Sequence, residues 1–88
     1  MHAVVVDVSI SDVEEAQREL RERVVPAVSQ APGFVSGVWL RPGEGKGHSV
    51  VVFETEEAAN EMAERVPSMV PPVVTVENVS VCEVAANA

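Results

Sequence analysis

The stretch Ala-Val-Val-Val-Asp-Val-Ser-Ile, residues 3–10, decides the fold of this chain. Successive side chains of a β-strand point to opposite faces, so the stretch divides into two sets of alternate positions. One set is wholly apolar and comprises Val4, Val6, Val8 and Ile10, whereas the other comprises Ala3, Val5, Asp7 and Ser9. We therefore expect a strand over residues 3–10 whose wholly apolar face lies under helices and whose Asp7 face meets a second layer.

Two other runs, residues 50–53 and 73–74, are apolar without alternation. Such runs are typical of strands buried on both sides, yet the sequence contains only enough helix to cover one side of a sheet. A second copy of the chain is the simplest source of the missing cover. A chain of 88 residues also buries only about two thirds of the surface of its unfolded form, so association adds burial. We predict a homodimer.

The charge balance is acidic, with a formal net charge of −8 and six basic residues. Nucleic acids and anionic membrane surfaces select clusters of Lys and Arg, so neither is an expected partner. The chain shows no signal peptide and no run near the roughly 18 apolar residues of a membrane span, which predicts a cytoplasmic protein. Cys82 is the only cysteine, and we expect it to be a small buried hydrophobe.

A first helix is predicted from Ser11, where the pattern Ser-Asp-Val-Glu matches a capping box. Apolar residues then follow at spacings of three or four and form one buried stripe: Val13, Ala16, Leu20, Val24 and Val28. Charge pairs one turn apart are expected at Glu14–Arg18 and Glu19–Arg23. Pro26 removes one backbone hydrogen bond, so we expect a kink or a last turn of altered geometry, after which Pro32-Gly33 ends the helix.

A second helix is predicted after Thr55, its cap, with acidic residues in the first turn, where the helix dipole favours them. Its buried stripe comprises Ala59, Met62 and Val66. The proline-rich segment 67–72 is expected to stop this helix and run extended. The remaining strands are expected over residues 34–41, 48–54 and 73–84, with a glycine-rich hairpin loop at 42–47 and a bulge at Glu77-Asn78.

The element order is therefore strand, helix, strand, strand, helix, strand. Right-handed crossovers turn this order into a four-stranded antiparallel sheet with two helices on one face, the ferredoxin-like βαββαβ arrangement of the α+β class. We expect residues 1–88 to form a single ferredoxin-like domain with residues 85–88 frayed. The face without helices would carry Val5, Val35 or Val38, and Trp39, a patch too apolar for a monomer.

Two short motifs resemble a known family. At Pro32-Gly33-Phe34 and at residues 52–58, Val-Phe-Glu-Thr-Glu-Glu-Ala, the chain resembles the dimeric α+β barrel proteins, particularly the antibiotic-biosynthesis-monooxygenase-like domains. In that family a Pro-Gly-Phe turn joins the first helix to the second strand, and an aromatic-acidic segment followed by Glu-Ala opens the second helix. The resemblance implies a homodimer whose two sheets face each other as a barrel, with the long last strand reaching toward the partner.

The chemistry of that family depends on residues that this chain has only in part. Its heme-degrading members use an Asn on the first strand and a Trp and a His elsewhere, whereas this first strand has Asp7 and the second helix has neither Trp nor His. Its quinone-forming monooxygenases use Asn, Trp, Tyr, His and Arg around an aromatic substrate. This chain has no tyrosine, and Trp39, His48 and Arg41 are the residues that could stand in.

Asp7 and His48 are the candidate catalytic residues. A carboxylate on the barrel-facing side of a central strand is partly desolvated, which suits Asp7 to act as a proton-abstracting base. The other interpretation is that Asp7 faces water at the barrel mouth or pairs with Arg41. His48 beside the glycine loop is either a second candidate base or an exposed strand-end residue.

Trp39, Phe53 and Met69 are the candidate ligand-binding residues. Trp39, the only tryptophan, is either an anchor of the dimer interface or a platform for a substrate. Phe53 is most simply part of the core. Met69 lies in a proline-rich segment that could act as a flap over the crevice between helices and sheet, where small ligands commonly enter such folds.

The leading functional hypothesis is a homodimer that binds a small apolar or aromatic molecule in that crevice. The alternative is a cofactor-independent monooxygenase or isomerase of secondary metabolism, with Asp7 as base and Trp39 or His48 as positioning groups. A regulatory ligand-sensing module is a third possibility, although such modules usually accompany a catalytic or DNA-binding partner. No metal is expected, because two histidines and one cysteine give no metal-ligand spacing. No organic cofactor is expected either.

Overall fold

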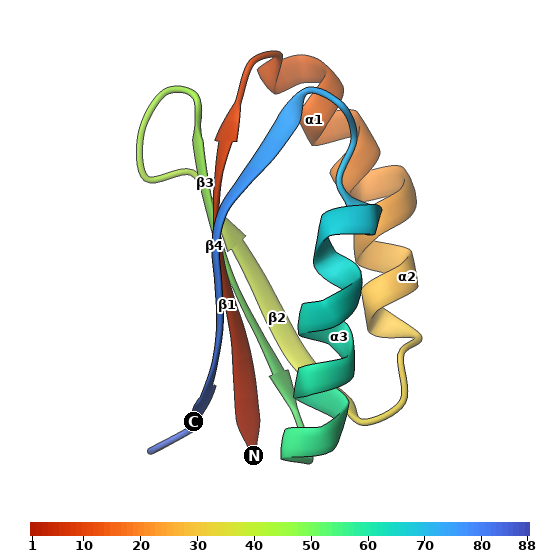
Figure 1. Cartoon of the computed structure of the whole chain (residues 1–88), viewed down its shortest axis with the longest axis vertical. Coiled ribbons are helices and arrows are strands. Elements are labelled where there is room, and N and C mark those ends of the chain that lie inside the picture. Colours follow the sequence, from red (N-terminus) through yellow and green to blue (C-terminus); the bar gives the residue numbers. More distant parts are fainter.

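A four-stranded antiparallel sheet with helices on one face makes up the fold, as the element order predicts. The computed structural model describes all of residues 1–88. The elements are β1 (His2–Ile10), α1 (Val13–Glu19), the π-helix η1 (Leu20–Val24), α2 (Val25–Ser29), β2 (Phe34–Leu40), β3 (Lys46–Phe53), α3 (Glu56–Met69) and β4 (Val74–Glu83). The strand order is β2-β3-β1-β4. Figure 1 shows the sheet nearly edge-on, with every helix on one side of it.

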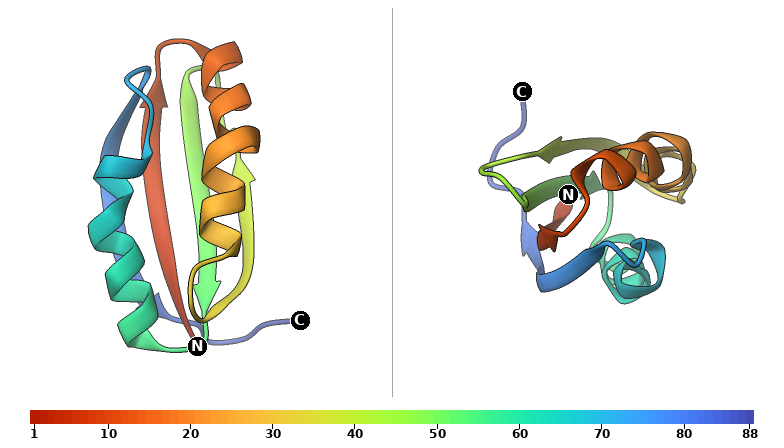
Figure 2. Two further views of the ribbon diagram at one scale, coloured as in Figure 1. Left: turned by 90° about the vertical axis from the view of Figure 1, so that its right-hand side faces the viewer. Right: turned by 90° about the horizontal axis from the view of Figure 1, so that it is seen from above.

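The helices divide the sheet between them. Figure 2 shows α3 lying over β4 and β1, and the α1-to-α2 segment lying over β3 and β2. The core fills the space between these two layers, and the wholly apolar face of β1 contributes to it as predicted. Its buried members are Val4, Val6, Val28, Val51, Phe53, Ala59, Met62 and Val66. None of the helices has both the length and the hydropathy needed to cross a bilayer.

The first helix begins one residue later than its sequence pattern indicates. Asp12, not Ser11, is the N-cap, and its carboxylate accepts a hydrogen bond of 3.1 Å from the Glu15 N–H. Ser11 is engaged elsewhere, because both its N–H and its hydroxyl donate to the Val73 carbonyl just before β4. The residue that follows β1 is therefore tied to the sheet, and the next one caps the helix.

The altered geometry expected from Pro26 takes the form of the π-helix η1, which lies before Pro26 and not in the last turn. There the Val25 N–H donates to the Leu20 carbonyl, five residues back instead of four. A proline has no N–H, and its ring crowds the carbonyl four residues back, so a wider turn just before it accommodates both effects. The helix therefore continues past this point as α2 with its apolar stripe directed to the sheet.

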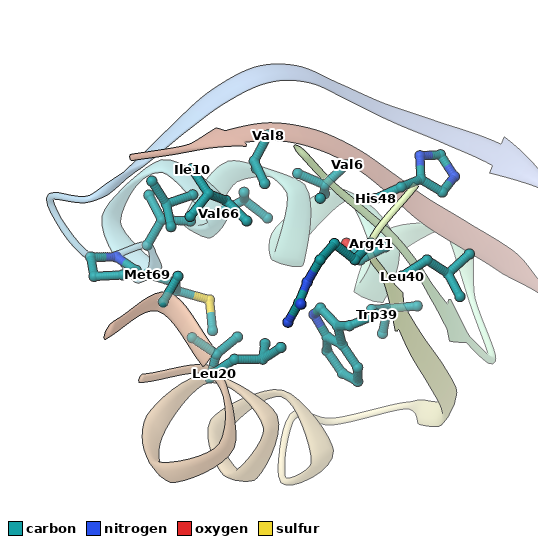
Figure 3. Close-up of a pocket in the computed structure, with 18 of the residues that line it drawn as sticks. Val6, Val8, Ile10, Leu20, Trp39, Leu40, Arg41, His48, Val66 and Met69 are labelled. Atoms are coloured by element: carbon teal, nitrogen blue, oxygen red, sulfur yellow. The ribbon is translucent and has the colours of Figure 1, made fainter. Parts of the chain in front are cut away.

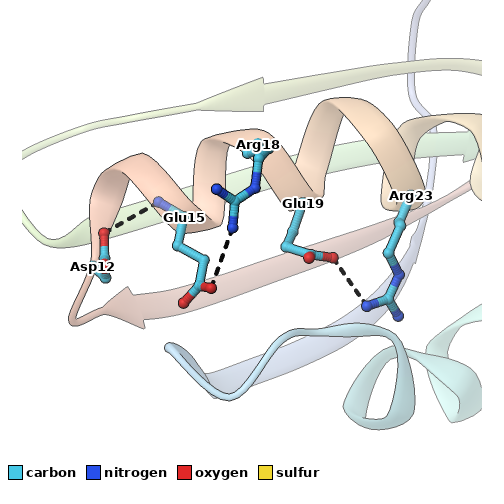
Figure 4. A network of polar contacts seen from close by, with 5 residues as sticks. All are labelled: Asp12, Glu15, Arg18, Glu19 and Arg23. Atoms are coloured by element: carbon cyan, nitrogen blue, oxygen red, sulfur yellow. Dashed lines mark hydrogen bonds and ion pairs between the residues drawn. The ribbon is translucent and has the colours of Figure 1, made fainter.

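Charged pairs cover the solvent side of α1 and η1 (Figure 4). Arg23 contacts Glu19 at 2.9 Å, as predicted. Arg18 contacts Glu15 at 3.3 Å rather than the predicted Glu14, since residues three apart are also neighbours on a helix. Both pairs are substantially exposed, so each contributes only a few tenths of a kcal/mol, about 0.2–0.5.

α3 begins as predicted but runs further. The Thr55 hydroxyl accepts a hydrogen bond from the Ala58 N–H, and the predicted stripe of Ala59, Met62 and Val66 is buried. The prediction that Pro67 stops the helix is wrong, because α3 continues through it to Met69. Pro67 removes a single hydrogen bond near the end of the helix, and the final turn packs Met69 against the core.

The two motifs that carry the family resemblance lie against each other. Gly33 has a φ of 81°, and its carbonyl accepts a hydrogen bond of 2.8 Å from the Glu54 N–H. A Cβ on Gly33 would lie 3.1 Å from the Ala58 Cβ in the first turn of α3. The neighbouring rings of Phe34 and Phe53 meet edge to face, with centroids 6.3 Å apart. The turn and the start of α3 are thus one packed unit.

The side of the sheet away from the helices is called the uncovered face here. Directly paired residues of antiparallel strands share a face, so the pairing of Asp7 with His48 and of Val38 with Val50 places all four on one side. By the same pairing, this face presents Val5, Asp7, Ser36, Val38, Leu40, His48, Val50, Asn78 and Ser80. Val38 and Leu40 are 47% and 50% exposed there.

Trp39 does not lie on the uncovered face, so that prediction is wrong. It pairs with buried Ser49 and packs against the core on the helix-covered side. The reason is a register shift between Phe34 and Ser36, which inserts one residue and reverses the alternation counted from Phe34.

β4 also carries an irregularity, at the predicted place. Its register against β1 shifts beside Asp7, and Glu77 is the extra residue between Val76 and Asn78. Cys82 is exposed, not buried as expected, because it pairs with Ala3 on the uncovered face of an edge strand.

Candidate functional site

A cavity of about 280 Å³ lies between the helices and the sheet. Every helix and strand contributes to its lining, which has 24 residues, 17 of them hydrophobic. The sheet side is formed chiefly by Val4, Val6, Val8, Ile10 and Val51, and the helix side by Ala16, Leu20, Val24, Val28, Met62, Val66 and Met69. A concave, mostly apolar space of this size is suited to a small apolar molecule.

Two side chains from the end of β2 are directed into this cavity. Figure 3 shows the Trp39 indole and the Arg41 side chain beside each other, facing Leu20 and Met69 across the space. Arg41 donates a hydrogen bond to Oε1 of Gln17 on α1. The bulge in β2 that turns Trp39 toward the helices also sets this direction for Arg41, two residues on.

The charge of the lining is opposite to that of the chain. None of the 14 Asp and Glu residues lines the cavity, although the net charge is −8. The basic residues that line it are Arg41 and Lys46. Lys46 pairs with Glu77 at 3.3 Å, whereas Arg41 has no carboxylate within 4.0 Å. The cavity therefore has one basic group without an acidic partner.

Two glycines shape the cavity, and sequence analysis missed both. A Cβ on Gly47 would lie 2.7 Å from Val8 Cγ2, and one on Gly37 would lie 3.0 Å from the Trp39 ring. Gly37 thus permits the close approach of the indole to its own strand. The available signal is glycine inside a strand, which often marks a close approach of this kind.

The predicted catalytic residues lie together, but on the uncovered face. His48 Nδ1 is 2.6 Å from Asp7 Oδ1, and their side chains are 32% and 45% exposed. His48 borders the cavity, yet its ring points away from it in Figure 3. Asp7 does not pair with Arg41, which bonds to Gln17 instead. Within one chain, the sheet separates Asp7 and His48 from Trp39.

The other two candidate ligand-binding residues differ in position. Met69, the last residue of α3, lines the cavity opposite Trp39. Phe53 is 0% exposed and lies in the core outside the cavity lining, where it packs on Phe34. No group of three or more His, Cys, Asp and Glu side chains is arranged to hold a metal ion.

Comparison with known proteins identifies the fold. No family model and no curated protein matches the sequence. Among solved structures, the chain is similar to a mutant of MhuD with two manganese protoporphyrin IX molecules bound per active site. That match has a TM-score of 0.68 and 22% identity, and it covers 100% of this chain and 98% of the other.

A second similar structure is the heme-degrader MhuD from Mycobacterium tuberculosis with two hemes bound in its active site. The TM-score is 0.59 and the identity 27%, over 97% of this chain and 98% of that one. The resemblance to the antibiotic-biosynthesis-monooxygenase-like fold, expected from the two short motifs, is confirmed.

Proposed function

We propose that this chain binds a small apolar or aromatic molecule in the helix–sheet cavity. The observation that carries the proposal is the cavity itself: about 280 Å³, lined by 17 hydrophobic residues out of 24, with the only tryptophan at its side. Binding of small molecules by neighbours of the same fold supports it. Aromatic ligands stack favourably on an indole, and thioethers such as that of Met69 adapt to varied shapes.

Heme does not fit the side chains of this cavity. Heme iron in proteins is held by His, Cys, Tyr or, usually with a His partner, by Met. The two histidines and the cysteine of this chain, which could in principle bind iron, are engaged or placed elsewhere. His48 bonds to Asp7, His2 lies near Glu56, and Cys82 is on the exposed edge strand. The chain has no tyrosine, so Met62 and Met69 are the remaining candidates in the lining. We do not extend the neighbours' heme chemistry to this chain.

The binding proposal is tested with N-phenyl-1-naphthylamine, an uncharged dye whose fluorescence rises in apolar surroundings. Wild-type protein should bind it with a single site per chain. Leu20→Ser places a hydroxyl in the lining and should weaken binding by about fivefold or more, because a lost apolar contact costs roughly 1–3 kcal/mol.

Val38→Ser is the matched variant on the uncovered face, and it should leave dye affinity unchanged. Circular dichroism checks that both variants fold. If Val38→Ser weakens binding and Leu20→Ser does not, the dye sits on the uncovered face and the proposal is wrong.

We further propose that the chain is a homodimer, with the uncovered faces of two copies packed together. Val38 and Leu40 supply exposed apolar area, and the polar groups that dilute this face are paired within it, Asp7 with His48 by a hydrogen bond and Lys46 with Glu77 by an ion pair. Covering paired charges avoids the cost of burying an unpaired one. A two-fold axis sets the same patch of both copies against each other, which suits a face with both signs of charge.

Light scattering at micromolar concentration tests the dimer. Wild type should give twice the chain mass of 9.4 kDa. Leu40→Asp puts an unpaired carboxylate in the interface and should yield the 9.4 kDa species, while Ala27→Asp, on the exposed side of α2, should remain dimeric. A monomeric wild type contradicts the proposal.

A further inference from the structure

We propose that the cavity selects amphipathic anions: molecules with a flat apolar body and one carboxylate or similar anionic group that pairs with Arg41. The inference deepens the proposed function and rests on it. It names the class of ligand and the residue that recognises its charged end.

The first support is the distribution of charge. In a chain with 14 acidic and six basic residues, a lining of 24 residues without a single carboxylate is a local inversion of the overall balance. A cavity for a cation would gain from acidic side chains at its edge, and this one has none. A chain of net charge −8 repels anions at long range, so recognition must occur at close contact.

The second observation is that the Arg41 guanidinium has no acidic partner. A guanidinium has five N–H donors, and here its hydrogen-bond partner is the neutral side-chain oxygen of Gln17. Arg41 is exposed to solvent, and its guanidinium lies beside the Trp39 indole in the lining of the cavity (Figure 3). Lys46, the other basic residue of the lining, is already paired with Glu77, so Arg41 is the group free to bind an anion.

The geometry combines these groups into one site. An aromatic ring resting along Trp39, between Leu20 and Met69, would place a substituent on its edge within reach of Arg41. Arginine matches a planar carboxylate with two parallel hydrogen bonds, and these bonds are stronger near apolar surroundings than in water. Gln17 holds the guanidinium in position for this pairing.

Two dyes that differ by one anionic group provide the test. 1-anilinonaphthalene-8-sulfonate carries a sulfonate that N-phenyl-1-naphthylamine lacks, so the ratio of their affinities isolates the contribution of the charge. Arg41→Gln should reduce affinity for the sulfonate dye about tenfold and change affinity for the uncharged dye less than about twofold. Affinity for the sulfonate dye should also fall with added salt, while affinity for the uncharged dye should not.

Arg65→Gln is the matched control, because it makes the same change in net charge at an exposed position on α3 outside the cavity lining. It should leave both affinities within about twofold of wild type. An equal loss for both dyes in Arg41→Gln, or an equal loss of the sulfonate dye in both variants, overturns the inference. If the uncharged dye fails to bind wild type, the proposed function itself is wrong and this inference falls with it.

Discussion

At Gly33, both the backbone and a neighbouring side chain exclude anything larger than hydrogen. Its φ of 81° lies in the left-handed region, and a Cβ there would approach Ala58 to 3.1 Å. We expect Gly33→Ala to lower the free energy of unfolding by about 1–3 kcal/mol, the usual cost of a strained non-glycine residue. Urea unfolding followed by circular dichroism measures this change.

Gly43→Ala is the control for that experiment. A Cβ on Gly43 would meet nothing within 4 Å, and its φ is not positive. The substitution should therefore leave stability unchanged or raise it by less than about 1 kcal/mol. Equal losses in the two variants would show that the packed unit of the turn and α3 has no special role.

Single residues also show where sequence reasoning reaches its limit. The direction of Val4 and Val6 could be predicted because β1 alternates, and the cavity side chains of Leu20 and Val24 followed from helical spacing. The direction of Trp39 could not, since both faces of β2 carry apolar residues and the local signal of irregularity, Gly37 inside the strand, does not say where the register shifts. The pairing of Asp7 with His48 depends on strand register, which no local pattern sets.

At the scale of single elements, substitutions test which residue caps the N-terminus of α1. Asp12→Ala removes the N-cap and should cost about 1 kcal/mol, whereas Asp12→Asn should retain most of that stability, because Asn caps helices about as well. Thermal or urea unfolding gives the comparison.

Ser11→Ala separates this assignment from the capping box that the sequence suggests. Ser11 contributes an exposed hydroxyl bond to Val73, so its loss should cost less than that of Asp12. A larger loss in Ser11→Ala would restore Ser11 as the cap. The two residues are adjacent and both are good caps, which is why propensity alone could not choose between them.

The two helical segments that contain proline, α2 with Pro26 and α3 with Pro67, differ in how well their geometry could be predicted. Altered geometry from Pro26 was expected and takes the form of η1, because a proline inside a helix lacks the N–H for one hydrogen bond and its ring crowds the carbonyl four residues back. Pro67 was expected to end α3, yet the helix extends to Met69. Whether a helix tolerates the lost hydrogen bond depends on what the following turn buries, and that is a tertiary property.

For the whole molecule, the proposed homodimer predicts a stability that depends on protein concentration. Folding linked to association gives a midpoint of thermal unfolding that rises with protein concentration. We expect the Tm of wild type to rise over an about hundredfold concentration range, and the Tm of Leu40→Asp to stay constant. Calorimetry or circular dichroism at several concentrations makes the measurement, and a constant Tm for wild type would contradict the dimer.

At this scale the order of strands and the side covered by helices were predictable, because they follow from element order and from one alternating strand. The cavity was foreseen as a crevice between helices and sheet. Its inverted charge was not, because the lining residues come from all eight elements and only the folded arrangement brings them around one space that no Asp or Glu reaches.

The sheet is a single layer with the cavity on one side and the paired charges on the other. Trp39 and Met69 line the cavity only, and Asp7, Val38 and Val50 lie on the uncovered face outside the cavity lining, whereas Leu40 and His48 border both. With the proposed ligand site and the proposed dimer interface, changes at residues that lie on one side only would alter the ligand without altering assembly, whereas changes at Leu40 or His48 would affect both. Divergence in what is bound and divergence in how copies associate can proceed as separate evolutionary events.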